Sequence, residues 1–230
     1  MSANRRYDCR SGGAFFEVVM PSPTASVDFY HRHAKRLADC YDGLTVEQVH
    51  GSWLPLVPVQ PGARALDVGA GCGRDACWLA QQGWHVTAVE PAAGMREIGQ
   101  QRSTALELGS DQLQWIDDSL PALKKVPDER YQLILLSAVW MHLSIAHRPV
   151  ALRRLVQMLA DTGVIVMTLR SGSGDPERPM YPVSAVEVRA IAKPLKISVE
   201  ELTPRADRGD LLERPEVSWQ TVILRRDQDS

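Results

Sequence analysis

The sequence predicts an α/β fold with a mostly parallel sheet. Short apolar segments with strand character alternate with segments of helical periodicity over most of the 230 residues. The segments 131–137 (YQLILLS) and 163–169 (GVIVMTL) are apolar almost throughout, as strands are when helices cover both faces of a sheet. An alternation of this kind favours parallel strands joined by helical crossovers.

The N-terminal part is expected to precede the sheet. We interpret residues 1–22 as a probable flexible tail and residues 23–62 as an N-terminal helical lid and connector. Within the lid, 26–41 has helical periodicity with Ser26 as a possible cap, and the prolines further on interrupt any helix. Residues 63–230 then form the main domain.

The main domain contains alternating strands and helices. The predicted strands are 64–68, 85–90, 112–116, 131–137, 163–169, 196–202 and 217–225. The predicted helices are 72–82, 93–106, 146–159 and 184–192. Ser184 and Glu187 fit a capping box for the last helix. Ligands bind beyond the carboxyl ends of parallel strands, so the loops after the strands should converge on one site.

Composition and charge are those of an ordinary soluble chain. Hydrophobic residues make up 44%, and the net charge of −2 gives no large basic surface, which disfavours nucleic acid as the partner. No apolar run reaches the roughly 20 residues of a membrane helix, so we expect no membrane association. The four cysteines lack CxxC or zinc-site spacing, which indicates free thiols, no metal site and a cytoplasmic location.

One loop carries the strongest functional signal. A buried strand holds Asp67 near its end, and Gly69, Gly71 and Gly73 follow at alternate positions before a helix. Glycines allow a tight turn and let a ligand pack against bare backbone, and the helix N-terminus offers free N–H groups. A dinucleotide loop would carry a third glycine where this chain has Arg74, and Asp67 would repel a diphosphate. The pattern therefore favours a ligand with an ammonium group and no phosphate.

A second carboxylate follows the next strand. The segment HVTAVE ends at Glu90, a common position for an acid that binds both ribose hydroxyls of a nucleoside. An acid at the end of a strand is frequent, but this one lies one βαβ unit after the glycine loop. Together the two features indicate a nucleoside site.

Residues 64–170 resemble the class I methyltransferases that use S-adenosylmethionine (SAM). LDVGAGCGR resembles the first motif of that family, D-x-G-x-G-x-G, and YQLILLSAVWMHL resembles its fourth-strand motif with Gln132 in place of Asp. The resemblance implies a Rossmann-like fold: a mostly parallel seven-stranded sheet, helices on both faces and an antiparallel last strand. It also implies SAM as the cofactor and S-adenosylhomocysteine (SAH) as its product.

The resemblance also implies which residues hold the cofactor. The glycine loop and Asp67 would hold the methionine part, Glu90 the ribose, and Asp117 or Asp118 the adenine amine, with Asp117 preferred. Tyr30 belongs to the segment that would cover the cofactor, although ordinary packing explains it equally well. The full implied set is Asp67, Gly69, Ala70, Gly71, Gly73, Glu90, Pro91, Met95, Asp117, Asp118, Ser137 and Tyr30.

The methyl acceptor is less well defined. His142 follows the fourth strand and is the candidate catalytic base, with a histidine bonded to the backbone as the alternative. Trp140 would stack on a planar acceptor or belong to the core. Arg170 and Arg178 lie in or beside the long polar loop after the fifth strand and would bind a carboxylate or phosphate, or are solvated. The candidate substrate-binding residues are Trp140, His142, Arg170, Arg178 and Tyr181.

We therefore expect an enzyme, a SAM-dependent methyltransferase acting on an N, O or S atom of a small molecule by in-line displacement. Methyltransferases of base amines often carry [N/D]-P-P-[Y/F] after the fourth strand, where this chain reads Ser137-Ala138-Val139-Trp140. Two alternatives stay open: a non-catalytic SAM-binding regulatory module and a tRNA-modifying methyltransferase. Asp67 and Arg74 oppose an NAD-dependent oxidoreductase.

Overall fold

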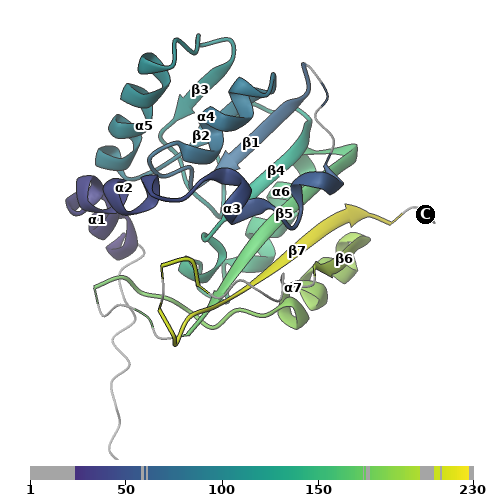
Figure 1. Cartoon of the computed structure of the whole chain (residues 1–230). Helices are drawn as coiled ribbons and strands as arrows, with labels where there is room; N and C mark the ends of the chain where they lie inside the picture. The colour runs from purple at the N-terminus through teal and green to yellow at the C-terminus, as the bar shows by residue number, and fades with distance from the viewer. Residues whose placement is uncertain are drawn as a thin grey trace, which may run out of the picture.

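A computed structural model of the chain describes residues 24–57, 60, 62–172, 174, 177–202, 210–212 and 214–227. The predicted tail at 1–22 lies outside them. In chain order the elements are α1 (Ala25–Arg32), α2 (Ala34–Asp42), α3 (Val46–His50), η1 (Leu54–Leu56), β1 (Arg64–Val68), α4 (Arg74–Gln81), β2 (His85–Val89), α5 (Ala93–Ala105), β3 (Leu113–Ile116), β4 (Tyr131–Ser137), η2 (Trp140–His142), α6 (Arg148–Met158), β5 (Leu159–Ser171), α7 (Ala185–Ala192), η3 (Lys193–Leu195), β6 (Ile197–Leu202) and β7 (Ser218–Arg226). Figure 1 shows their arrangement. None of the helices described is long and apolar enough to cross a bilayer.

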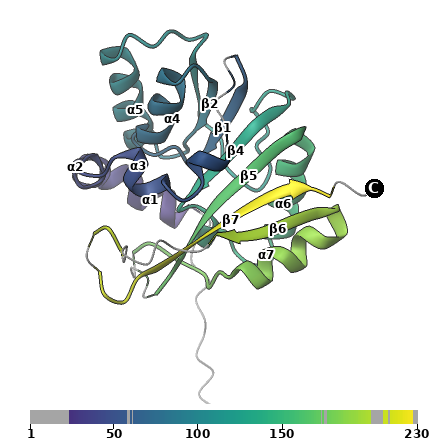
Figure 2. The same cartoon turned by 45° about the vertical axis from the view of Figure 1, so that its right-hand side comes forward.

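Seven strands form one sheet in the order β3-β2-β1-β4-β5-β7-β6. The pairs from β3 to β5 are parallel, and β7 runs antiparallel to both β5 and β6 (Figure 2). The predicted mostly parallel sheet with an antiparallel last strand is therefore confirmed.

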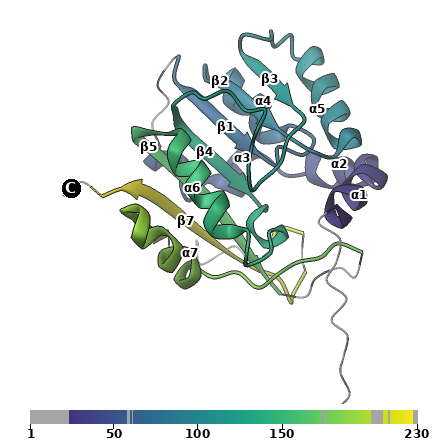
Figure 3. The same cartoon turned by 180° about the vertical axis from the view of Figure 1, so that it is seen from behind.

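Side chains of each central strand alternate between the two faces of the sheet. In β4, Ile134 and Leu136 join the core cluster that includes α6 and α7, whereas Leu133 and Leu135 join the cluster that includes α4. Figure 3 shows α6 and α7 over one face, and Figure 1 shows α3 and α4 over the other. Because both faces are covered, the strands read as continuous apolar runs rather than as alternating ones.

The N-terminal helical segment differs from the prediction of one helix over 26–41. The chain forms two helices, α1 and α2, separated at His33, whose backbone (φ −106°, ψ 14°) is not helical. Both helices pack against α5, and the N–H of Gly94 donates to Nδ1 of His31 at 2.9 Å. A Cβ atom on Gly94 would lie 2.9 Å from the carbonyl oxygen of His31. The interruption of the helix and the absence of a side chain at Gly94 together let α5 approach α1 closely.

One of the two predicted helix caps is confirmed. The hydroxyl of Ser184 accepts the N–H of Glu187 at 3.2 Å, so Ser184 caps α7, but the Glu187 carboxylate binds Arg148 and does not complete the predicted capping box. The prediction for Ser26 is wrong, because Thr24 occupies the N-cap of α1. The Ser26 hydroxyl instead donates to the carbonyl oxygen of Pro179 at 3.4 Å, which ties α1 to the segment before α7.

A buried ion pair joins α6 to α7. Arg148 is fully buried, and its Nη1 donates to both carboxylate oxygens of Glu187 at 2.6 Å. The same guanidinium donates to the carbonyl oxygens of Leu143 at 3.1 Å and Pro182 at 2.8 Å. It therefore fixes the segments that precede the two helices.

Replacing Glu187 with alanine is expected to lower the free energy of unfolding by about 3 kcal/mol, because the substitution leaves a buried guanidinium without its counter-charge. Urea denaturation measures the loss. Glu200→Ala is the matched control, since Glu200 pairs with Arg225 on the surface with 59% of its side chain exposed. That variant should lose less than about 1 kcal/mol. Equal losses in the two variants would contradict the role given to the buried pair.

Candidate active site

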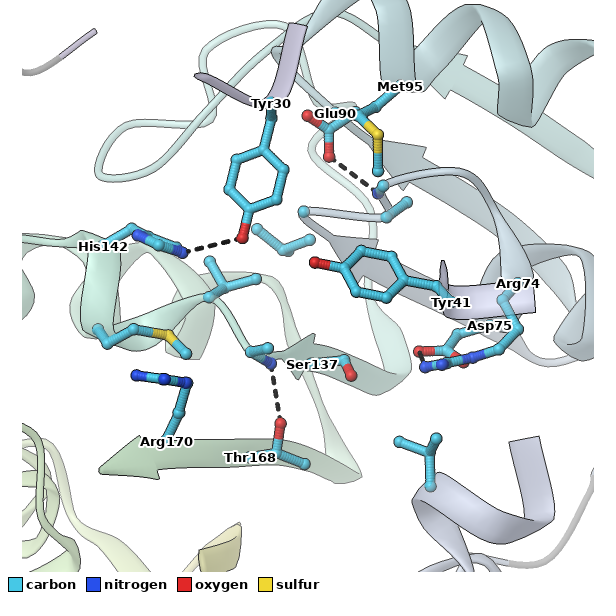
Figure 4. A pocket seen from close by; sticks show the side chains of 18 of the residues that line it. Tyr30, Tyr41, Arg74, Asp75, Glu90, Met95, Ser137, His142, Thr168 and Arg170 are labelled. Carbon is cyan, nitrogen blue, oxygen red and sulfur yellow. Dashed lines mark hydrogen bonds and ion pairs between the residues drawn. The ribbon is translucent and has the colours of Figure 1, made fainter. Parts of the chain in front are cut away.

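A cavity of about 410 Å³ lies at the carboxyl ends of the strands. Loops that follow β1 to β5 contribute to its wall, as do α1, α2 and the start of β7. The sheet order places β1, β2 and β3 on one side of it and β4, β5 and β7 on the other. Figure 4 shows Glu90 and Met95 apart from His142 and Arg170. We call these the Glu90 side and the His142 side.

The glycine loop brings bare backbone to the Glu90 side. Gly69 (φ +74°) and Gly71 (φ +56°) adopt left-handed conformations that favour glycine. A Cβ atom on Gly69 would lie 2.5 Å from Cγ2 of Val139. The N–H of Gly71 donates to Oε2 of Glu90 at 2.8 Å. No side chain fits at Gly69 unless Val139 moves, so the loop is shaped for contact between backbone and ligand.

The third glycine has a packing role instead. Gly73 (φ +82°) lies at the N-cap of α4 and does not line the cavity. A Cβ atom there would lie 2.9 Å from the indole of Trp115 and 3.2 Å from Cα of Gly99. Gly73 therefore lets α4 pack closely against β3 and α5, which corrects its predicted contact with a ligand.

Glu90 links the loops after β1 and β2. Its carboxylate is buried and accepts the N–H groups of Gly71 and Ala92, both at 2.8 Å. Burial raises the pKa of Glu90, and the two backbone N–H donors oppose that rise. A carboxylate has about four lone-pair sites, so two sites stay available to hydroxyl groups of a ligand.

Asp67 lies beneath the glycine loop rather than on the cavity wall. Its side chain is buried, and Oδ2 has no hydrogen-bond partner among the described residues. Burial raises the pKa of Asp67 well above its ordinary value, and the nearby charge of Asp75 raises it further. The predicted direct contact of Asp67 with a ligand therefore has no counterpart on the cavity wall.

His50, Arg74 and Asp75 form a cluster that the sequence did not indicate. Asp75 accepts from Nε of Arg74 at 2.7 Å, from Nη2 at 3.0 Å and from Nε2 of the fully buried His50 at 2.9 Å. Burial raises the pKa of Asp75, but the charges and hydrogen bonds of His50 and Arg74 bring it well below its ordinary value. Arg74 and Asp75 line the cavity, so α3 is anchored at the glycine loop.

The two acids after β3 have different positions. Asp118 lines the cavity, and its carboxylate accepts the N–H groups of Ser119 at 2.8 Å and Lys125 at 2.5 Å. Asp117 has 56% of its side chain exposed and pairs with Arg96 and Lys125 at the surface. Of the two acids, Asp118 rather than the preferred Asp117 therefore lies on the cavity wall.

His142 lies in a chain of hydrogen bonds on its side of the cavity. Its Nδ1 donates to the carbonyl oxygen of Pro179 at 3.1 Å, so Nε2 is an acceptor and receives the O–H of Tyr30 at 3.3 Å (Figure 4). Nη1 of Arg178 donates to the Tyr30 oxygen at 3.0 Å. Burial lowers the pKa of His142 to about 4, and the charges of Arg178 and Arg170 lower it as well. Burial also raises the pKa of Tyr30. Both groups are therefore uncharged at neutral pH.

Two predicted substrate contacts are corrected. Trp140 is fully buried in the core cluster with α6 and α7 and does not line the cavity. Its place in a single turn of 3₁₀ helix turns the indole inward while His142, two residues later, reaches the cavity. Tyr181 also lies off the wall, where its backbone N–H donates to the carbonyl oxygen of Met141 at 2.8 Å.

The remaining predicted site residues line the cavity. They are Tyr30, Gly69, Ala70, Gly71, Glu90, Pro91, Met95, Asp118, Ser137, His142, Arg170 and Arg178. Thr168, which the sequence analysis missed, is also on the wall, and its hydroxyl accepts the N–H of Ala138 at 2.8 Å. Ala138 has a left-handed φ of +59°, so Thr168 holds the loop after β4 in an uncommon conformation. Among the described residues, no three His, Cys, Asp or Glu side chains are grouped as metal ligands.

Comparison with known proteins gives both a family and structural neighbours. Residues 65–163 match the family model described as a methyltransferase domain. Magnesium protoporphyrin IX methyltransferase from Synechocystis PCC 6803 with bound SAM has a TM-score of 0.66 at 16% identity, over 91% of this chain and 99% of that one. A TehB-like SAM-dependent methyltransferase from Corynebacterium glutamicum has a TM-score of 0.61 at 18% identity, over 88% and 99%. Phosphoethanolamine N-methyltransferase 2 from Haemonchus contortus, in complex with phosphomonomethylethanolamine and SAH, has a TM-score of 0.67 at 14% identity, over 90% and 59%. No curated protein sequence matches the chain.

The matched residues run from β1 into β5 and include the glycine loop, Glu90 and the loop after β4. The structural neighbours share the fold over about nine-tenths of this chain. At identities of 14–18%, that likeness describes the fold alone. Residues 65–163 of this chain therefore match a methyltransferase-domain model, and the chain has the Rossmann-like fold of its class I methyltransferase neighbours.

Proposed function

We propose that this chain is an enzyme that uses SAM to methylate a nitrogen, oxygen or sulfur atom of a small molecule. The observation that carries the proposal is the bare glycine loop bonded to the buried Glu90 carboxylate, both on one cavity wall. The methyltransferase-domain match over the same residues supports it.

The residues on the Glu90 side of the cavity suit the methionine, ribose and adenine parts of SAM. The backbone at Gly69 and Gly71 leaves room for the methionine part, and the open lone pairs of Glu90 suit two ribose hydroxyls. Asp118 and Met95 line the wall where the adenine would lie. An ammonium group above the loop would favour the ionised form of the buried Asp67.

When bound, SAM would supply a sulfonium methyl group: the acceptor atom would attack the methyl carbon in line and bond to it, while the C–S bond breaks and its electrons stay with the departing sulfur. The protein mainly provides proximity and orientation, effects worth up to about 7–11 kcal/mol. In our proposal Nε2 of His142 takes the proton of the acceptor, either directly or through the hydroxyl of Tyr30. An imidazole that is neutral at pH 7 suits this role.

The acceptor is proposed to be a small molecule because α1 and α2 cover the cavity. Ser26 and Tyr30 of α1 and Tyr41 of α2 contribute to its wall, and 410 Å³ lies within the range of small-molecule sites. This assigns residues 24–57 the role of a lid. The free thiols of Cys40, Cys72 and Cys77 suit the reducing cytoplasm in which we place the enzyme.

Calorimetric titration with SAM, SAH and NAD tests the proposed cofactor. We expect SAM and SAH to bind and NAD not to bind. Glu90→Ala should weaken SAM binding by at least about 100-fold, because two charge-assisted hydrogen bonds to the ribose are lost. Glu200→Ala, which removes an exposed carboxylate of β6, is the control and should bind SAM normally. A folded wild-type protein that binds neither SAM nor SAH would overturn the proposal, and SAH formation with added acceptors separates an enzyme from a binding module.

A further inference from the structure

We propose that the His142 side of the cavity binds an anionic group, a carboxylate or a phosphate, on an otherwise apolar methyl acceptor. The inference rests on the proposed function, because it names the class of acceptor. Three arginines from separate segments, Arg170, Arg178 and Arg214, line this part of the wall.

The sheet order separates these arginines from the Glu90 side. Arg170 lies near the carboxyl end of β5 and pairs in register with Trp219 of β7, which also lines the cavity. β5 and β7 lie beyond β4, whereas Glu90 and Asp118 follow β2 and β3 on the other side of β1. Figure 4 shows Arg170 on the same side as His142 and across the pocket from Glu90. A ligand group bound by the arginines would therefore belong to the acceptor.

The carboxylates that line the cavity in the described part of the chain are Asp75, Glu90, Asp118 and Asp210. The first three belong elsewhere: Asp75 is held by Arg74 and His50, and the other two by backbone N–H groups at the ends of β2 and β3. Of this described set, Asp210 alone lies beside the arginines.

Asp210 is already fully engaged. It accepts from the backbone N–H of Arg214 at 3.0 Å, from Nε at 2.8 Å and from Nη2 at 2.7 Å, and from the indole N–H of Trp219 at 2.7 Å. These bonds lower the pKa of Asp210 against the effect of burial, so it carries one negative charge at neutral pH. Asp210 is therefore committed to Arg214 and Trp219, and no carboxylate on the described cavity wall pairs with Arg178, which favours an anionic ligand there.

Arg178 is fixed in an orientation that suits an anion. Its Nη1 donates to Tyr30, and its guanidinium lies over the rings of Phe29 at 5.2 Å and Tyr30 at 5.5 Å. No described carboxylate forms an ion pair with it, and its buried Nε has no hydrogen-bond partner among the described residues. A planar guanidinium held in this way is preorganised for bidentate binding of a carboxylate or phosphate.

The arginines on this side act on one another and on His142. Burial lowers the pKa of Arg170, and so do the positive charges of Arg214 and Arg178, while the carboxylates of Asp210 and Glu216 oppose that fall. Arg178 and Arg170 also lower the pKa of His142. A bound anion would offset this repulsion and raise the pKa of His142 toward its ordinary value. Acceptor binding would thereby strengthen the proposed base.

The rest of this wall suits an apolar body. Its side chains include Met141, Met180, Leu202, Leu211 and Trp219. Burial of alkyl or aryl surface stabilises a complex by about 25 cal/mol per Å². The acceptor class is therefore an amphipathic organic anion, with its nucleophilic atom within reach of His142.

Binding to the SAH complex of the full chain tests the inference. The probes are 1-naphthyl phosphate and 1-naphthoate, with neutral 1-naphthamide as the uncharged control. At least one anion should bind about tenfold or more tightly than the amide, the worth of one charge-assisted hydrogen bond, and the tighter anion shows which group is preferred. Arg170→Gln and Arg178→Gln should each weaken anion binding about tenfold and leave amide binding unchanged. Arg153→Gln, which removes an exposed arginine of α6, should have no effect on either probe.

A second measurement locates the bound anion. NMR titration should show that the anion raises the pKa of His142. Equal affinities for the anions and the amide, anion binding unaffected by both arginine substitutions, or a pKa of His142 that does not move would each overturn the inference. SAH titration of every variant separates the two proposals. If SAH binds and the anions fail, only the acceptor class is wrong, whereas a wild-type protein that does not bind SAH overturns the proposed function.

Discussion

Replacing His142 with alanine is expected to lower kcat by about 10²- to 10⁴-fold, the usual contribution of a general base, and to leave SAM affinity unchanged. We expect kcat to change without SAM affinity because the imidazole lies away from the proposed cofactor site. The imidazole contacts Tyr30 and Pro179 on its own side of the cavity, while Glu90 and the glycine loop lie on the other. Initial rates of SAH formation at saturating SAM give kcat, and calorimetry gives the affinity.

The pH dependence gives this base a second signature. A base acts in its unprotonated form, so with a pKa of about 4 the wild-type kcat/KM should fall only below about pH 5. Arg178→Gln removes a positive charge and should move this fall to higher pH. The folded protein should also lose stability as the pH falls from 6.5 toward 4, because the unfolded chain binds this proton first.

Two variants sharpen the test of His142. His147→Ala removes an exposed imidazole outside the cavity and should retain full turnover. Tyr30→Phe keeps the ring and loses the hydroxyl that donates to Nε2, so it should reduce kcat without reproducing the full loss. If His142→Ala turns over at the wild-type rate, His142 has no part in the chemistry and its hydrogen bonds are structural.

Most of the fold could be predicted because its signals are local. The run 131–137 corresponds residue for residue to β4, since a strand buried on both faces needs apolar side chains throughout. The Glu90 side of the cavity could also be predicted from local sequence, because the glycine loop and Glu90 belong to one βαβ unit. The choice between two acids after β3 had no such local signal. Beyond Ile116 the alternation of faces stops, so no pattern distinguished the surface Asp117 from the cavity residue Asp118.

The His142 side depends on contacts between distant segments. Tyr30 meets His142 and Arg178 more than 110 residues later in the chain. No local motif specifies such pairs. Thus spacing indicated the residues proposed for the cofactor and offered His142, Arg170 and Arg178 as candidates for the acceptor, whereas the contacts of Tyr30 with His142 and Arg178 required the tertiary structure.

Alanine at Gly69 is expected to weaken SAM binding by about 100-fold. The φ of +74° costs a residue with a Cβ about 1–2 kcal/mol, and that Cβ would lie 2.5 Å from Cγ2 of Val139. Val139 is β-branched and has few rotamers, so it cannot readily turn aside. The free loop can relax, but binding returns it to the strained conformation. A combined cost of about 3 kcal/mol corresponds to about 100-fold in the dissociation constant.

A control and a second substitution test the collision at this loop. Gly62 has a similar φ of +79° but lies outside the cavity, and a Cβ atom on it would meet nothing within 4 Å, so Gly62→Ala should bind SAM normally. Val139→Ala in the Gly69→Ala background removes the colliding methyl group and should recover about tenfold of the lost affinity. If the second substitution recovers nothing, the left-handed backbone alone excludes a side chain at Gly69. In either case the bare backbone, rather than any side chain of the loop, is what the cofactor requires.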